Sequence, residues 1–350
     1  MNATRMLDEI VKKNSSNLDI IKRITPINLN EENERFLKLY HGGILYNPQY
    51  IYNSNSELNH IKEKIEEINF DSNSTIGSIY KRYQEYLLDC IEITNLIGKT
   101  YEFTKMSIKI FGSPSNDILQ KAIVILNDHN KNDYNNEEQY DAKCMRQIFI
   151  DEIKKHAFDW NVEIIDNISS KVAVDPDEKK IYINGKVLFS KNDMSRLLVH
   201  EFGTHVMRAE NGSKQPYFIF QNGFPKSIET EEGLATYNEW KNNLLDTKTL
   251  RIYAGRVLAV KLSLEKSFYE AFIELNKFFL EEESIRMISR VKRGLEDTSQ
   301  PGAFTKDFVY LNGFFKVKDN INLDTEKILY SGIIGLDDIK QVSLLNNIIY

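Results

Sequence analysis

The stretch Val199-His200-Glu201-Phe202-Gly203-Thr204-His205-Val206 places two imidazoles on either side of a carboxylate. Further along, the chain reads Thr230-Glu231-Glu232-Gly233-Leu234-Ala235. Neutral imidazoles and a carboxylate are good ligands for zinc, and a neighbouring glutamate can accept a proton from a water that the metal holds. These residues therefore predict a mononuclear zinc hydrolase site.

The spacing of the two histidines is unusual. They stand at i and i+5, which places them about 140° apart around an ideal helix, whereas the familiar metalloprotease spacing of i and i+4 places them about 40° apart. A single π-type turn with i→i+5 bonding would return both to one face, and Gly203, which has no Cβ, eases such a distortion. We therefore expect a locally widened helix at Phe202-Gly203-Thr204.

Ordinary buried residues are the alternative interpretation of this stretch. The preceding apolar run, Leu197-Leu198-Val199, would bury the helix, and a buried histidine or glutamate then needs a hydrogen-bond partner whether or not a metal is present. The chain has six histidines, and two of them fall in this one window, which favours the metal site.

Two motifs and several shorter matches resemble one known family. The stretch from Val199 to Arg208, followed by Asn211-Gly212 and Gln215-Pro216, and the stretch from Thr230 to Tyr237 closely resemble a family of HExxxH metallopeptidases. That family includes the microtubule-associated tyrosine carboxypeptidase and bacterial proteins with a QEGLA motif. Weaker matches follow in order along nearly the whole chain, at Pro26-Ile27-Asn28, Asn47-Pro48, Phe111-Gly112-Ser113-Pro114, Phe304-Thr305-Lys306-Asp307 and Tyr310-Leu311-Asn312-Gly313.

The resemblance implies a zinc-dependent carboxypeptidase with one Zn²⁺ ion per chain, held by His200, His205 and one glutamate of the Glu231-Glu232 pair. Many bacterial relatives have glutamine at the position of Glu231, so Glu232 is the expected third ligand. Glu231 would then orient a histidine through its second ring nitrogen, although an exchange of the two roles stays open. Glu201, next to the first ligand, is the expected general base.

The reaction also needs a donor for an oxyanion, and an exopeptidase needs a cation for the terminal carboxylate. Tyr310, as a catalytic donor, and Lys306, as a substrate-binding cation, are the first candidates because they lie in a stretch that resembles the family. Further substrate-binding candidates are Arg208, Arg251 and Arg256. The alternatives are structural, since Lys306 and Asp307 would pair at the surface and Arg208 would tie its helix to the core.

Composition excludes several classes of function. The formal net charge is −6, and basic residues are interspersed with acidic ones, so we predict no nucleic-acid partner. Cys90 and Cys144 have no CxxC spacing, which indicates a reducing compartment. Residues 1–18 hold no apolar signal segment and no long apolar run occurs elsewhere, so we expect neither a secretory signal nor a membrane span. The expected location is the cytoplasm.

The predicted fold is α+β and mostly helical. Ile61, Ile65 and Ile68 recur at helical spacing, which predicts an N-terminal helical region, 1–157, with a polar loop at 129–139. Short β-branched runs between residues 160 and 190, with turn residues between them, predict a small antiparallel sheet. This sheet and the helix with His200 would form a zincin-like catalytic domain, 158–350, with a C-terminal helical part.

The sequence also predicts where some of the helices begin and end. Ser190 or Asn192 should cap the helix that carries His200, and Glu232 should open a second helix that ends at Leu245. Residues 251–279 read as one long helix that 281–293 continues. By analogy with zinc peptidases of similar build, an edge strand should lie beside the metal helix and pair with an extended substrate.

The function predicted is a zinc metallo-carboxypeptidase that removes the C-terminal residue of a peptide or protein through a Glu-activated zinc-bound water. An aromatic residue such as tyrosine is the expected leaving residue. The alternatives are a zinc endopeptidase or amidase, and a non-catalytic zinc-binding regulatory protein. Glu201 argues against the last, because a structural zinc site is usually closed by a fourth protein ligand and needs no general base. The expected partner is a peptide or protein C-terminus, without nucleic acid or membrane.

Overall fold

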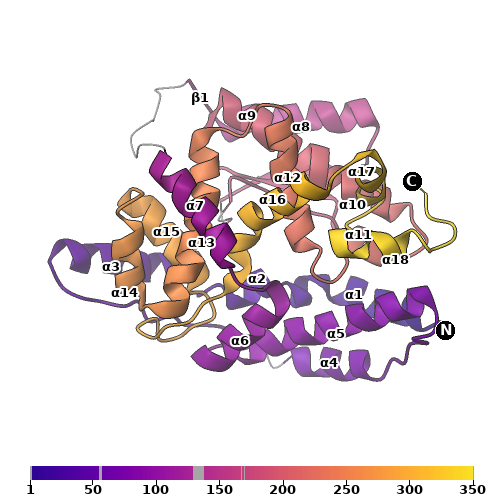
Figure 1. Cartoon of the computed structure of the whole chain (residues 1–350), viewed down its shortest axis with the longest axis horizontal. Coiled ribbons are helices and arrows are strands. Elements are labelled where there is room, and N and C mark those ends of the chain that lie inside the picture. The colour runs from indigo at the N-terminus through magenta and orange to yellow at the C-terminus, as the bar shows by residue number, and fades with distance from the viewer. Residues whose placement is uncertain (1, 55–56, 129–137, 167, 169, 350) are drawn as a thin grey trace. The chain divides into compact units, whose positions relative to one another are not determined.

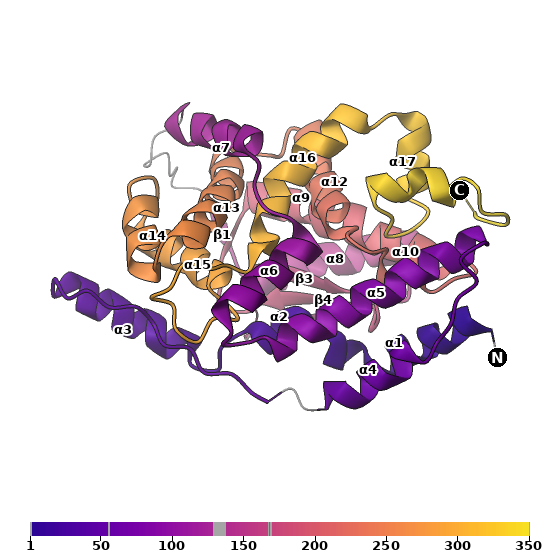
Figure 2. The ribbon, with the colours of Figure 1, turned by 60° about the horizontal axis from the view of Figure 1, so that its bottom comes forward.

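The computed structural model describes residues 2–54, 57–128, 138–166, 168 and 170–349. The chain is mostly helical with two small sheets, so the predicted α+β class is confirmed (Figures 1 and 2). Contacts group the chain into two compact units, each built from two segments. Unit 1 comprises Met1–Asp133 and Thr247–Asn312, and unit 2 comprises Tyr134–Asp246 and Gly313–Tyr350. The division into a helical region, 1–157, and a catalytic domain, 158–350, differs from this grouping and stays a prediction.

Unit 1 is helical. Its elements are α1 (Ala3–Leu18), α2 (Ile20–Ile24), α3 (Leu29–His41), α4 (Leu58–Glu66), α5 (Thr75–Asn95), α6 (Thr100–Phe111), α7 (Asn116–Asp128), α13 (Thr247–Glu265), α14 (Phe268–Leu275), α15 (Glu281–Val291), the 3-10 turn η2 (Thr305–Phe308) and the start of α16 (Val309–Asn320). Helices α1, α4 and α5 lie side by side (Figure 2). The apolar stripe predicted from Ile61, Ile65 and Ile68 is buried, which confirms the helical packing there.

The prediction of one long helix over residues 251–279 is wrong. Helix α13 ends at Glu265, and Ser267 then caps α14 by accepting a hydrogen bond from the Glu270 N–H while the Glu270 carboxylate accepts one from the Ser267 N–H. This reciprocal pair satisfies two free N–H groups at a helix start, so the chain begins a new helix although the apolar pattern continues.

Unit 2 contains the sheets. A three-stranded sheet holds β2 (Asn161–Ile165), β4 (Lys180–Asn184) and β3 (Val172–Asp175) in that order, and β1 (Gln139–Tyr140) pairs with β5 (Phe189–Ser190). Strands β3 and β4 are antiparallel, but β2 runs parallel to β4, so the predicted antiparallel sheet is wrong for β2. Ile181 and Ile183 on β4 are fully buried. The most buried strand takes the middle of the sheet, and β2 therefore pairs with β4 and not with the strand that follows it in sequence.

The core of unit 2 joins this sheet to two helices. Phe149 on α8 (Ala142–His156), Ile181 on β4 and Phe202 belong to one buried cluster. Helix α8 packs on β2 and β4, which explains why residues 142–156 group with the sheet and not with unit 1. Strand β3 is an edge strand and lies beside the helical segment of His200, as expected by analogy.

The helical segment that carries His200 and His205 follows β5 directly. Ser190 is the N-cap of α9 (Lys191–Leu197) and forms a capping box with Asp193, whereas the Asn192 side chain donates to Asp246. Helix α9 then widens into the π-helix η1 (Leu198–Val206) before α10 (Met207–Ser213) resumes the ordinary form. The widened turn predicted at Phe202-Gly203-Thr204 is therefore confirmed.

Unit 2 also contains helices that follow this segment in the chain. They are α11 (Ile219–Asn222), α12 (Ile228–Lys241), the end of α16, α17 (Leu323–Leu329), the 3-10 turn η3 (Leu336–Asp338) and α18 (Ile339–Val342). The predicted helix from Glu232 to Leu245 is displaced, because α12 begins at Ile228 and carries acidic side chains in its first turn, where the helix dipole favours them. Of the helices described, none has the length and apolar character that crossing a membrane requires. The predicted loop at 129–139 falls outside the described residues except for its last two.

Two glycines allow α12 to cross α16 closely. A Cβ on Gly233 would overlap the backbone of Gly313, and a Cβ on Gly313 would overlap the carbonyl oxygen of Glu229. Both obstacles are backbone atoms that cannot rotate away, so the crossing requires glycine at both positions. By contrast, a Cβ on Gly203 would meet its nearest atom, the Leu198 carbonyl oxygen, at 3.8 Å, an ordinary contact.

We predict that Gly313→Ala destabilises the protein by roughly 1–3 kcal/mol because the two helices must move apart. Gly203→Ala, the matched control in the same unit, should change stability by less than about 1 kcal/mol, since alanine fits there and favours a helix. Thermal denaturation followed by circular dichroism measures both. Equal melting temperatures for Gly313→Ala and the parent protein would contradict the close crossing.

Candidate functional site

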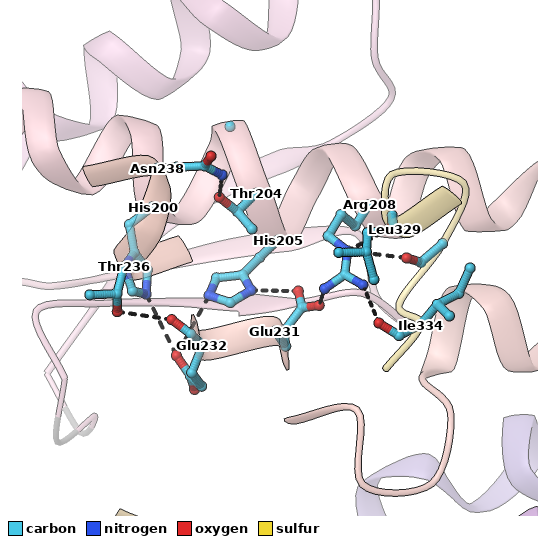
Figure 3. A network of polar contacts seen from close by, with 12 residues as sticks. His200, Thr204, His205, Arg208, Glu231, Glu232, Thr236, Asn238, Leu329 and Ile334 are labelled. Carbon is cyan, nitrogen blue, oxygen red and sulfur yellow. Dashed lines mark hydrogen bonds and ion pairs between the residues drawn. The ribbon is translucent and has the colours of Figure 1, made fainter. Parts of the chain in front are cut away.

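The widened turn brings His200 and His205 together. Both imidazoles are largely buried, and their ring centroids lie 5.0 Å apart. The Nε2 atom of His200 lies 3.6 Å from Glu232 Oε2, and the Nε2 atom of His205 lies 3.9 Å from the same oxygen. Figure 3 shows the two rings and Glu232 turned toward one another. The structure thus places three of the predicted ligands around one point.

These separations suit a tetrahedral ion. Two donor atoms that each lie about 2.1 Å from one zinc ion are roughly 3.4 Å apart in a tetrahedral site. The observed 3.6 and 3.9 Å are slightly wider, so a small inward movement would complete the site. Glu201 also lies close to the two imidazoles, because three donor atoms, one each from His200, Glu201 and His205, lie within 4.8 Å of one another. Two imidazoles and a carboxylate fit zinc, and Glu201 supplies a second carboxylate nearby.

Each histidine is held through its other ring nitrogen. The Nδ1 atom of His200 lies 2.6 Å from Glu239 Oε1, and the Nδ1 atom of His205 lies 2.6 Å from Glu231 Oε1. A carboxylate accepts a hydrogen bond from Nδ1–H, which leaves the Nε2 lone pair free for a metal. The contacts therefore place Glu231 beside His205 as an orienting group, the position predicted for the glutamate that is not a ligand.

Both orienting carboxylates are paired with buried guanidinium groups. Arg196 Nη1 donates to Glu239 Oε1 at 2.9 Å, and Arg208 Nη1 donates to Glu231 Oε2. Glu239 is fully buried and Arg208 is inaccessible to solvent, so each charge needs the partner that it has. Glu239 and Arg196 were not anticipated from the sequence. The signal was present, because Glu239 follows Glu232 by seven residues and two turns of helix return it to the same face.

Arg208 is a structural residue. Its Nε donates to the carbonyls of Leu329 and Gly332, and its Nη2 donates to the carbonyl of Ile334 at 2.7 Å (Figure 3). A side chain with no solvent exposure and these acceptors is committed to its own fold, so the substrate-binding prediction for Arg208 is wrong. The alternative that it ties its helix to the core is confirmed.

The charge around the imidazoles favours a divalent cation. The carboxylates of Glu201, Glu231, Glu232 and Glu239 are all buried, and they face the two guanidinium groups of Arg196 and Arg208. Two negative charges are therefore left when both imidazoles are neutral. Buried charge of this kind is costly unless it is compensated, and an ion of charge 2+ compensates it.

Without a metal, the excess negative charge favours the protonated form of both imidazoles. Burial by itself lowers the pKa of His200, but hydrogen bonds to Glu232 and Glu239 outweigh it and raise the pKa to about 10. The pKa of His205 is likewise raised, against the effect of burial, by Glu231. Burial raises the pKa of Glu201 above its ordinary value.

Tyr310 and Arg256 meet in unit 1. The ring of Tyr310 stacks on Tyr253 with centroids 5.4 Å apart, and the guanidinium carbon of Arg256 lies 4.2 Å from the Tyr310 centroid. Nη1 of Arg256 is buried, and among the described residues no oxygen accepts a hydrogen bond from it. Substrate binding by Arg256 therefore stays a prediction, and the side chain has a donor that a carboxylate could use.

The other two candidates in unit 1 have different surroundings. Arg251 is buried and donates to the carbonyls of Leu126 and Phe278, so it ties α13 to its neighbours and the substrate-binding prediction for it is wrong. Lys306 is half-buried in η2 and stays a candidate. The proposed surface pair with Asp307 is wrong, because Asp307 is buried and accepts two hydrogen bonds from Arg290.

Comparison with known proteins shows the family to which the chain belongs. The family described as microtubule-associated tyrosine carboxypeptidase matches residues 34–348. The chain belongs to this family. The match covers both the segment of His200 and His205 and the segment of Glu231 and Glu232, so these residues belong to the part of the chain that makes it a member.

Relatives with similar names occur in mammals. The chain is 32% identical over 155 residues to microtubule-associated tyrosine carboxypeptidase 1 of Mus musculus, which is 42% of this chain and 32% of the relative. The human protein of the same name is 29% identical over 152 residues, 41% of this chain and 31% of the relative. Mouse "putative tyrosine carboxypeptidase MATCAP2" is 24% identical over 339 residues, 94% of this chain and 56% of the relative. The matches thus span between about a third and about half of the relatives' length.

We predict that Arg208→Met destabilises the protein by about 3–5 kcal/mol, because Glu231 would be left as an unpaired buried charge. Arg208→Met with Glu231→Gln should be clearly more stable than Arg208→Met alone, since the second change removes that charge and still leaves an oxygen for His205. Denaturant unfolding of both variants and of Glu231→Gln completes the cycle. Additive losses would show that the two side chains are not coupled.

Proposed function

We propose that this chain is a zinc metallo-carboxypeptidase that hydrolyses the C-terminal residue, an aromatic one such as tyrosine, of a peptide or protein. The single observation that carries the proposal is the convergence of His200 Nε2 and His205 Nε2 on Glu232 Oε2, with a carboxylate on each Nδ1. Family membership supports the exopeptidase class, and the relatives' names support tyrosine.

Three side chains would hold one Zn²⁺ ion: His200, His205 and Glu232. When bound, zinc would polarise the scissile carbonyl and lower the pKa of a water at its open position. Glu231 and Glu239 would keep the imidazoles in the tautomer whose Nε2 lone pair is free to bind the metal.

Glu201 would act as the general base and then as the general acid. It is buried beside the two imidazoles, and its raised pKa places its proton exchange closer to neutral pH than that of an exposed glutamate. Its carboxylate would accept a proton from the attacking water and donate it to the leaving amine.

Substrate recognition would use a hydrogen-bonding strand and a cation. Strand β3 lies at an edge of its sheet beside η1, and an extended peptide can pair with such an edge through its main chain. Arg256 is the cation that we propose for the terminal carboxylate, because its Nη1 has an unused donor among the described residues. Tyr310 stays the proposed donor to the oxyanion, and Lys306 stays a second candidate cation. The cytoplasmic location stays a prediction from the sequence.

Substitutions of three glutamates should affect zinc binding and turnover differently. Glu232→Gln should weaken zinc binding by more than Glu231→Gln does, because it replaces a ligand and not an orienting group. Glu201→Gln should keep zinc and the fold but lose about 10²- to 10⁴-fold in kcat. Metal analysis after dialysis and turnover of a peptide that ends in tyrosine measure both effects. A fully active Glu201→Gln protein would assign the proton transfer to another group, and the reverse order for Glu231 and Glu232 would exchange their roles.

Amidation of the substrate terminus tests the exopeptidase class. A charge-assisted hydrogen bond is worth about 1.5–3 kcal/mol, so kcat/KM should be about 10- to 200-fold lower for a peptide amide than for the free acid. Arg256→Met should lower kcat/KM for the free acid and leave the value for the amide nearly unchanged, whereas Arg251→Met, the matched control, should not discriminate between them. Equal turnover of acid and amide with internal cleavage would indicate an endopeptidase. Zinc binding without any cleavage would indicate a regulatory protein.

A further inference from the structure

At the end of the π-helix, the hydrogen bonding of the backbone changes its reach. The N–H of Met207, the residue after η1, donates to the carbonyls of Phe202 and Thr204 and passes over the carbonyl of Gly203. Such an omission arises where a helix changes from i→i−5 bonding back to i→i−4 bonding. A buried carbonyl that finds no donor costs free energy, so a side-chain donor to the Gly203 carbonyl would stabilise the widened turn.

That donor is the hydroxyl of Tyr330. It lies 3.0 Å from the Gly203 carbonyl oxygen and donates a hydrogen bond to it. Tyr330 follows α17, and its own carbonyl accepts a hydrogen bond from Asn211 Nδ2 at 2.8 Å. A residue far along the chain therefore supplies a hydrogen bond to a carbonyl of the widened turn.

A second hydroxyl supports the same widened turn from within. Thr204 is fully buried, and its Oγ1 donates to the carbonyl of Val199, five residues earlier, at 3.2 Å. The i→i−5 reach of this hydrogen bond matches the spacing of the π-helix and not that of an α-helix.

Asn238 connects the two hydroxyls. Its Nδ2 donates to Thr204 Oγ1 at 2.8 Å and to the Tyr330 hydroxyl at 2.8 Å (Figure 3 shows Asn238 above Thr204). An amide NH₂ group has two protons and does not accept hydrogen bonds. Each hydroxyl therefore accepts a hydrogen bond from it and donates one to a carbonyl of η1. The direction of every hydrogen bond in this network is thereby set, and both ends of the network fall on the widened turn.

The network reaches the helix that carries the carboxylates. Asn238 precedes Glu239, which holds His200, and it lies on α12 with Glu232. The position of α12 therefore determines both where the third proposed ligand lies and whether η1 keeps its widened form.

We propose that Asn238 and Tyr330 are positioning residues that hold η1 in the π-form and so keep Nε2 of His200 and His205 on one side of the helix. The link to metal affinity rests on the zinc site put forward under Proposed function, whereas the link to the helix form does not.

The test compares two small deletions in one segment. Tyr330→Phe removes only the hydroxyl that serves Gly203. Asn211→Ala, the matched control, removes a hydrogen bond to the backbone of the same Tyr330 and leaves the network on η1 intact. Hydrogen–deuterium exchange of metal-free protein, in peptides that cover residues 198–208, reports on the helix form. Zinc affinity by chelator competition and the absorption bands of the Co²⁺-substituted protein report on the ligand geometry.

Tyr330→Phe should speed exchange over residues 198–208 by about 5- to 100-fold, weaken zinc binding by about 10- to 100-fold and shift the Co²⁺ bands. Asn211→Ala should lower the melting temperature without these changes. If both variants lose stability while exchange over η1, zinc affinity and the Co²⁺ bands stay as in the parent protein, Tyr330 is only a structural residue and the proposal is overturned.

Thr204→Val is a second test of the same network, and it leaves the segment after α17 unchanged. Its effect on exchange should not add to that of Tyr330→Phe, because Asn238 couples the two hydroxyls; strict additivity would overturn the proposed network. If the parent protein binds no zinc, the proposed function fails, and the exchange measurements on metal-free protein still decide whether the network holds the π-form.

Discussion

Two buried imidazoles five residues apart can face one point only if the helix between them is widened. An α-helix would direct His200 and His205 about 140° apart, so every arrangement in which they share a metal requires the π-helix Leu198–Val206. The widening disrupts regular backbone bonding and must be supported from outside. Strand β3, helix α12 and the segment after α17 all contact this turn, and the structure of unit 2 depends on keeping it in that form.

The second requirement is to bury charge without leaving it unpaired. Four carboxylates surround the imidazoles, and Arg196 and Arg208 compensate two of them. Arg208 in turn holds the carbonyls of Leu329, Gly332 and Ile334, so the end of the chain that follows α17 is tied to the orientation of His205. The remaining negative charge is the electrostatic reason to expect a divalent cation, and the raised pKa of both histidines follows from the same excess.

Helix α12 is the element in which these requirements meet. Glu231 orients His205, Glu232 faces both Nε2 atoms, Glu239 orients His200, and Asn238 directs the hydroxyls that support the widened turn. The close crossing of α12 and α16, which needs glycine at 233 and 313, fixes the depth of α12 in unit 2. Most side chains between Thr230 and Glu239 are buried, so each of these polar groups needs a partner inside unit 2.

The sequence by itself determined the local features: the His-Glu pattern, the need for a π-turn, a cap at Ser190 or Asn192 and the helical stripe of Ile61 and Ile65, because each depends on the spacing of side chains along one element. It also located the glutamate pair. Only the tertiary structure decided what depends on contacts between distant segments. Arg208 proved to be structural because carbonyls from residues 329–334 surround it. Strand β4 lies in the middle of the sheet because it is the most buried strand, and Tyr330 reaches Gly203 across 127 residues. Local spacing fixes direction along a helix, but only packing decides which distant group satisfies a buried donor, acceptor or charge.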